Sequence, residues 1–207
     1  MAGNADTAAV LREAKVTHET AKLGLEDFLH GQTPGRRIAG LRNVVVWGRA
    51  VTNVLQNIKT FDRERFEAWY APRQTAMREK TDFKYLVDLR SQVLKEGVLG
   101  GISSSLHIEE FNTSQLRDLP PAPPGAGGFF IGDHLGGSGW IVKLADGTEE
   151  RYYVELPTHW KMTMKTYFTD VTTQLGLPPP SIPIDQLLTE YVAYLGDLIK
   201  SAQKEFA

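Results

Sequence analysis

Cysteine is absent from this chain of 207 residues, and so is any long uninterrupted apolar run. The first absence excludes disulfides, thiolate zinc sites and cysteine nucleophiles. The second excludes a membrane-spanning helix, which needs about 20 predominantly apolar residues in succession. The first residues also lack the basic start and apolar run of a secretory signal. We therefore expect a cytoplasmic protein with no membrane partner.

A general excess of basic charge is missing as well. The net charge is -2, which argues against a uniformly basic nucleic-acid binder. The charge is uneven, however: residues 31–100 hold 13 Lys or Arg against 7 acids, a net charge of +6, and the remainder has -8. This local excess can attract RNA phosphate or an acidic protein partner. Alternatively, the helices only expose mixed, solvated faces. Self-association between the basic and acidic parts is a third interpretation.

Hydrophobic residues make up 42% and charged residues 23%, as in ordinary globular domains. Apolar residues recur at three- and four-residue spacing, which predicts four amphipathic helices in the first half. Asp62 is the expected N-cap of the third helix, and Pro72 should kink or split it. Gly40 and Gly48 in the second helix would permit another helix to approach closely. The expected helical stripes lie within residues 11–28, 36–58, 63–80 and 82–96.

The pattern then changes to short β signals. Ile102 to Ile108 alternate in polarity, and a Pro/Gly-rich loop at 118–128 follows. Further strand signals occupy 128–131, 140–145 and 148–156. Asp146 and Gly147 join the last two, which is a strong hairpin signal.

Helices are expected again after this sheet. Trp160, Met164 and Phe168 stand four residues apart and predict a helix from about 157 to 175, and a last helical stripe begins at Ile184. We therefore expect an α+β protein, mainly a bundle of about six helices, with a small antiparallel sheet inserted before the last two. As one domain of residues 1–207 it would comprise a helical half at 1–98, a β insertion at 101–156 and returning C-terminal helices at 157–207.

Catalytic constellations are not evident in the sequence. The five histidines stand apart and give no set of three metal ligands, so we expect neither a metal nor a cofactor. His18 lies on the apolar stripe of the first helix, where a hydrogen-bonded core or interface histidine is the expected role. The glycine-rich stretch from Gly132 to Trp140 opens a strand rather than a helix, which favours a hairpin loop over a phosphate cradle.

The segment from Phe66 to Gly97 resembles the HEPN superfamily, whose helical bundles are associated with toxin–antitoxin and defence systems. Its ribonuclease members carry an arginine and a histidine separated by four to six residues, usually on a helix that faces the dimer interface. Arg90 stands at the arginine position here, but Lys95 replaces the histidine. A second near-match contains Arg42 with Trp47 at the histidine position. The resemblance implies a homodimer that lacks the family's proton carrier.

The missing histidine favours binding over chemistry, since lysine is protonated at neutral pH and cannot act there as a general base. Our leading interpretation is thus a non-catalytic interaction or regulatory module rather than an enzyme. The expected anion- or RNA-binding residues are Arg42, Arg49, Arg90 and Lys95.

Two alternatives remain open at this point. One is a divergent, metal-independent ribonuclease that uses a remote histidine such as His107. The other is a sensor of a small, nucleotide-like ligand, with a pocket between bundle and sheet. Its lining, or a partner surface, would consist of Trp140, Tyr152, Tyr153 and Trp160.

Overall fold

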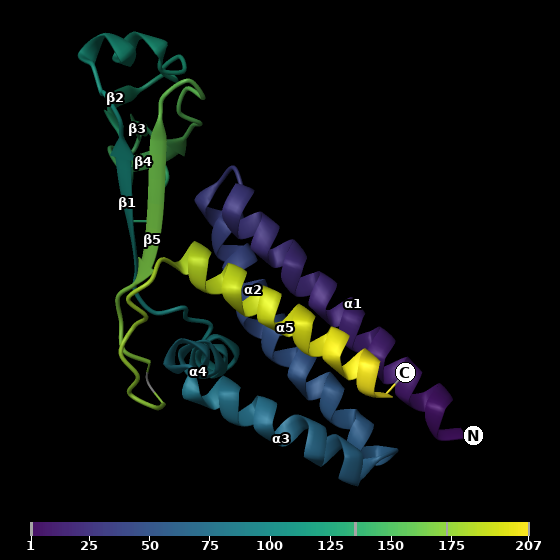
Figure 1. The fold of residues 1–207 in the computed structure, drawn as a ribbon. Helices are drawn as coiled ribbons and strands as arrows, with labels where there is room; N and C mark the ends of the chain where they lie inside the picture. Colours follow the sequence, from purple (N-terminus) through teal and green to yellow (C-terminus); the bar gives the residue numbers. More distant parts are fainter. Residues whose placement is uncertain (1, 135, 173, 207) are drawn as a thin grey trace.

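The computed structural model describes residues 2–134, 136–172 and 174–206. In these ranges five α-helices form a bundle, and five strands form an arm that projects from one end of it (Figure 1). The helices are α1 (Ala2–His30), α2 (Pro34–Leu55), α3 (Arg63–Glu79), α4 (Thr81–Glu96) and α5 (Ile184–Phe206). The strands are β1 (Ile102–Ile108), β2 (Ala126–Phe130), β3 (Gly139–Lys143), β4 (Glu149–Tyr153) and β5 (Met162–Phe168). Two short 3-10 segments are η1 (Gln56–Thr60) and η2 (Thr113–Asp118).

Local sequence signals set the helix ends. The Thr33 side chain accepts a hydrogen bond from the Arg36 amide at the start of α2, and Asp62 accepts one from the Arg65 amide at the start of α3. Gly97 ends α4 in the left-handed conformation, with φ of 71°, which glycine adopts without steric cost. The four predicted N-terminal helices are thus confirmed. Of the two effects expected at Pro72, the split does not occur, because α3 runs continuously past it, and the kink stays a prediction.

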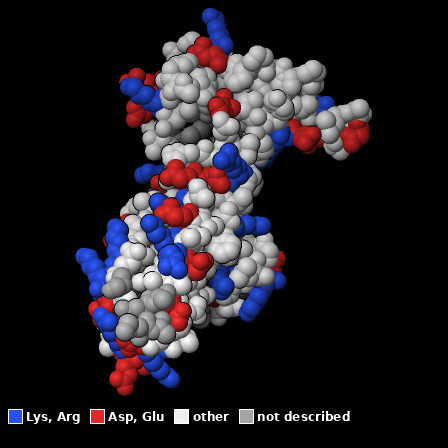
Figure 2. All heavy atoms as spheres, turned by 90° about the vertical axis from the view of Figure 1, so that its right-hand side faces the viewer, with Lys and Arg blue, Asp and Glu red and all other residues white. Residues whose placement is uncertain are grey.

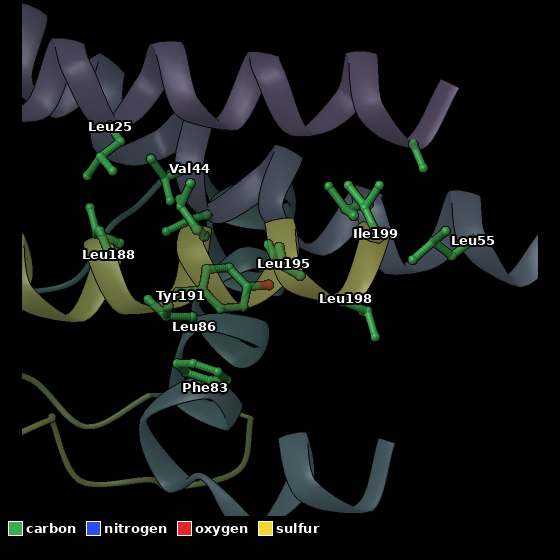
Figure 3. Close-up of a cluster of buried hydrophobic side chains, with 14 of the residues drawn as sticks. Leu25, Val44, Leu55, Phe83, Leu86, Leu188, Tyr191, Leu195, Leu198 and Ile199 are labelled. Atoms are coloured by element: carbon green, nitrogen blue, oxygen red, sulfur yellow. The ribbon is translucent and has the colours of Figure 1, made fainter. Parts of the chain in front are cut away.

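The apolar stripes of the helices meet in one core. Helix α5 lies against α1 and α2, and its Tyr191 faces Phe83 of α4 (Figure 3). Leu188, Leu195 and Ala202 on the same side of α5 are fully buried. Burial of one such leucine side chain stabilises the fold by roughly 1.5–3 kcal/mol.

Glycines permit two close contacts between helices. A Cβ added to Gly40 of α2 would stand 2.5 Å from the backbone oxygen of Gly24 in α1. A Cβ added to Gly48 would stand 2.5 Å from the Tyr191 ring in α5. The predicted close approach at both positions is confirmed.

The arm consists of two antiparallel sheets. Strands β1 and β5 pair from Ile102 opposite Phe168 to Ile108 opposite Met162, and β2, β3 and β4 form the second sheet in that order. Side chains along β1 alternate between half-buried and exposed, as its sequence predicted. At the base of the arm, the Tyr85 hydroxyl of α4 donates to the Asp170 carbonyl at 3.0 Å.

The helix predicted from 157 to 175 is wrong, because its centre forms β5. Met164 and Phe168 share one face at a spacing of four, and that spacing fits a strand of period two as well as a helix. Threonines and aromatic residues favour the strand, and β1 supplies its partner. One α-helix therefore follows the arm in the described chain instead of the expected two. The single-domain organisation of residues 1–207 stays a prediction.

Charges of both signs intermingle on the face shown in Figure 2, where a narrower waist separates the arm from the bundle. Ion pairs between neighbouring helical turns also occur in the bundle, for example Arg63 with Glu67 at 3.0 Å. On this face, the interpretation of mixed, solvated helix surfaces therefore applies.

Replacing Gly40 by Ala is expected to destabilise the protein by about 1–3 kcal/mol, the usual cost of overpacking. The added Cβ would collide with backbone atoms of Gly24 and Phe28, which cannot rotate away. Urea unfolding followed by circular dichroism measures the change. Gly35→Ala is the matched control on the same helix, since nothing lies within 4 Å of its added Cβ. Equal free energies of unfolding for the two variants would contradict the close helix contact.

Candidate functional site

A basic pocket opens among α2, α3, α4 and α5, with a volume of about 240 Å³. Arg49 from α2, Arg78 from α3 and Lys84 from α4 line this basic pocket. The described lining residues include no carboxylate and no imidazole. The nearby Asp88 carboxylate is buried behind the lining, where it accepts a hydrogen bond from the Leu175 amide at 3.0 Å.

Aromatic rings form the inner wall of the basic pocket. They belong to Tyr70, Phe83 and Tyr191, which are almost fully buried. The ring centroids of Phe83 and Tyr191 lie 5.0 Å apart in an edge-on arrangement. These rings give the pocket an apolar wall beside the cations.

The two tyrosine hydroxyls stay neutral at physiological pH. Burial raises the pKa of Tyr70, and the charges of Arg49 and Arg78 only partly oppose this rise. Burial also raises the pKa of Tyr191, against the charges of Arg49 and Arg90. At pH 7 both phenols are therefore neutral and can form hydrogen bonds, but neither acts as a base.

Local features of three helices bring the cations together. Gly48 lets α5 approach α2, and Tyr191 of α5 therefore lies beside Arg49, the residue that follows Gly48. The Arg49 guanidinium is held on its own helix by a hydrogen bond to the Thr52 hydroxyl. Lys80 alone connects α3 to α4, so that Arg78 and Lys84 flank one tight turn.

The structure separates the four cations expected from the sequence. Arg49 lines the basic pocket, and Arg90 lies close enough for its charge to act on Tyr191. The Arg90 Nε is buried and has no hydrogen-bond partner among the described residues. Arg42 instead donates to the Gly97 carbonyl at 2.8 Å, and Lys95 is exposed near the end of α4. Neither is among the described lining residues.

Sequence reasoning missed Arg78, Lys84 and the aromatic wall. The charge excess in residues 31–100 included both cations but gave no information on which of its 13 basic residues converge. Phe83 and Tyr70 follow the helical stripes, so they were indistinguishable from ordinary core residues.

The four aromatic residues expected around a ligand do not share one pocket. Trp160 is buried against Phe111 and Trp140 packs on Phe129, whereas Tyr152 is 55% exposed. Of these four residues, only Tyr153 is among the described residues that line a cavity between bundle and arm.

Histidines are engaged away from the basic pocket. The His18 Nε2 lies 2.8 Å from the Val192 carbonyl oxygen, which confirms the hydrogen-bonded role predicted for it. His159 pairs with Asp118 at 3.2 Å, and His30 with Glu26 at 3.7 Å. The described residues contain no group of three or more side chains arranged to hold a metal ion.

The glycine-rich loop that begins at Gly132 does connect two strands, β2 and β3, as predicted. Residue 135 of this loop lies outside the described residues. The loop is anchored by Asp133, whose side chain accepts a hydrogen bond from the Gly137 amide at 2.9 Å.

Comparisons with family models, curated proteins and solved structures found no match to this chain. Within the described residues, none of the helices combines the length and apolar character that crossing a membrane requires. Function must therefore be inferred from the site itself.

Proposed function

We propose that this chain is a non-catalytic, regulatory binding module that recognises an anionic ligand in the basic pocket. The supporting observation is the lining: three cations and an aromatic wall, without a carboxylate or imidazole among the described residues. Arginine and lysine side chains remain protonated at neutral pH, so they hold an anion without accepting its protons. Acid–base catalysis requires a group whose pKa lies near the working pH.

The same lining favours a nucleotide-like ligand. Guanidinium groups bind phosphate through paired, charge-assisted hydrogen bonds, and Arg49 and Arg78 can supply them. A planar base would lie against the rings of Tyr70 and Phe83. The volume of about 240 Å³ admits a small ligand or the charged end of a larger one.

A thermal-shift titration with AMP tests this proposal. At AMP concentrations a hundredfold above Kd, binding adds about 2.7 kcal/mol, which corresponds to roughly 5–10 °C in Tm for a chain of this size. Lys84→Gln removes one cation from the pocket and should weaken AMP binding by about tenfold. Adenosine, which lacks the phosphate, should shift Tm much less.

Lys95→Gln is the matched control, because Lys95 lies on the same helix as Lys84 but outside the described lining. It should bind AMP like the unmodified protein. The proposal is wrong if AMP leaves Tm unchanged, or if both lysine variants weaken binding equally.

A homodimer through α2 or α4, as the HEPN resemblance implies, is part of the proposal. Its support is an exposed apolar face on and just after α4. Val87 and Leu94 stand seven residues apart on one side of α4 and are 38% and 55% exposed, and Val98, just beyond the end of the helix, is 47% exposed. Trp47 on α2 is also 42% exposed.

Leu94→Glu should convert this dimer to a monomer, because a buried unpaired charge at an interface is strongly unfavourable. Light scattering at micromolar concentration measures the mass. Val16→Glu is the control, since Val16 is 60% exposed on α1, away from the proposed face, and it should remain dimeric. A monomeric unmodified protein would exclude the dimer while leaving the ligand proposal intact.

The ribonuclease alternative has less support. Arg42 and Lys95 are not in the described lining of the basic pocket, and the histidine that this alternative needs is distant. His107 is exposed on β1, at the end of the strand farther from the bundle.

A further inference from the structure

The six residues from Leu119 to Pro124, which we call the proline segment, read LPPAPP and favour a left-handed polyproline II helix. Proline fixes φ at about -65°, and a residue that precedes a proline is restricted to extended backbone. The structure agrees, because Leu119 has φ of -65° and ψ of 145° and the chain forms neither helix nor strand before β2. The 3-10 segment η2 and the proline segment after it lie at the outer end of the arm, away from the bundle (Figure 1).

Contacts at both ends hold the proline segment in place. Just before it, the Asp118 carboxylate lies 3.2 Å from the His159 Nε2. Just after it, the Lys143 amide of β3 donates to the Gly125 carbonyl at 3.0 Å. The segment is thus formed without a partner, and a partner that binds it loses little free energy to its ordering.

Exposure along the proline segment follows the period of polyproline II, in which residues three positions apart share one edge of the helix. Pro120 and Pro123 share an edge and are both half-buried. Pro121 and Pro124 share the next edge and are both exposed, as is Ala122 beside them. The segment therefore rests one edge on the arm and presents two prolines side by side to solvent.

The backbone of the proline segment offers hydrogen-bond acceptors to a partner. Among the described residues, no hydrogen bond reaches the carbonyls from Leu119 to Ala122. Proline lacks an amide hydrogen, so the segment carries many more acceptors than donors. Side chains that donate while presenting an apolar ring, such as tryptophan and tyrosine, complement both its carbonyls and its prolines.

A positive charge stands beside this surface. Arg117, two residues before Leu119, is exposed and forms no ion pair with a described residue, whereas the acidic neighbour Asp118 is paired with His159. A guanidinium in this position favours a partner with carboxylates at the border of its binding surface. We propose that the proline segment docks into a groove of a partner protein, lined by tyrosine and tryptophan and bordered by carboxylates, as in SH3 domains.

The other proline run of the chain, Pro178 to Pro180, supplies the matched control. Pro178 is exposed, but the residue three positions further is Ser181, and Pro180 is buried. This run therefore presents no exposed edge with two prolines. Replacing Pro178 removes an exposed proline without changing the proposed docking surface.

An NMR titration of an isotope-labelled SH3 domain with the full chain tests the proposal. The SH3 domain carries carboxylates beside its aromatic groove, and the signals of this groove should shift saturably as the chain is added. The double variant Pro121→Ala/Pro124→Ala should weaken binding at least about tenfold. Arg117→Glu should also weaken it about tenfold, because its charge is then repelled by the carboxylates. Pro178→Ala should bind like the unmodified chain.

Unchanged groove signals would overturn the proposal, and so would equal weakening by the Pro178 variant and the double variant. Light scattering distinguishes the alternative occupant. Self-association that is lost in the double variant but kept in Pro178→Ala would identify a second copy of this chain as the partner, and the proposal would be wrong. None of the substituted residues lines the basic pocket, so these results are independent of those obtained with AMP.

Discussion

Contact between the Tyr191 ring and the backbone of Gly48 is the constraint on which this structure depends. The Tyr191 side chain of α5 packs directly on the backbone of α2 at this point, since a Cβ added to Gly48 would stand 2.5 Å from its ring. The ring then lies between the core and the basic pocket, where it packs on Phe83. The same contact that closes the bundle therefore places an aromatic wall beside Arg49.

The chemistry of the basic pocket follows from the kinds of charge that this packing assembles. Arg49, Arg78 and Lys84 supply cationic side chains, and burial raises the pKa of the Tyr70 and Tyr191 phenols further above neutrality. Arginine and lysine side chains in general are protonated at neutral pH, and phenols are neutral. Such a site is suited to holding an anion in a fixed position, which is the basis for proposing a binding rather than a catalytic role.

The sequence predicted the bundle well because its helices carry their own signals. These signals are local features: the apolar stripes, the Asp62 N-cap, the helix end at Gly97 and the Asp146–Gly147 hairpin turn. Strand β5 was missed because a spacing of four residues fits both a helix and a strand, and its partner β1 lies about 60 positions away in the chain. Only the tertiary pairing decides between the two.

The candidate site was predicted only in part for the same reason. Arg49 was identified from local charge, but its association with Arg78 and Lys84 depends on how three helices pack. Arg42 resembled a site residue in the sequence, yet in the structure it donates to the Gly97 carbonyl at the end of α4. The aromatic residues expected to surround a ligand do not converge either, since Trp140 and Trp160 pack on different neighbours within the arm.

The most direct test of the central claim is incubation of the purified, metal-free protein with RNA, with chain cleavage followed over time. The account predicts that the RNA remains intact, because the described lining of the basic pocket contains cations but no group that could carry a proton. RNA cleavage that disappears in Arg90→Ala would contradict the account.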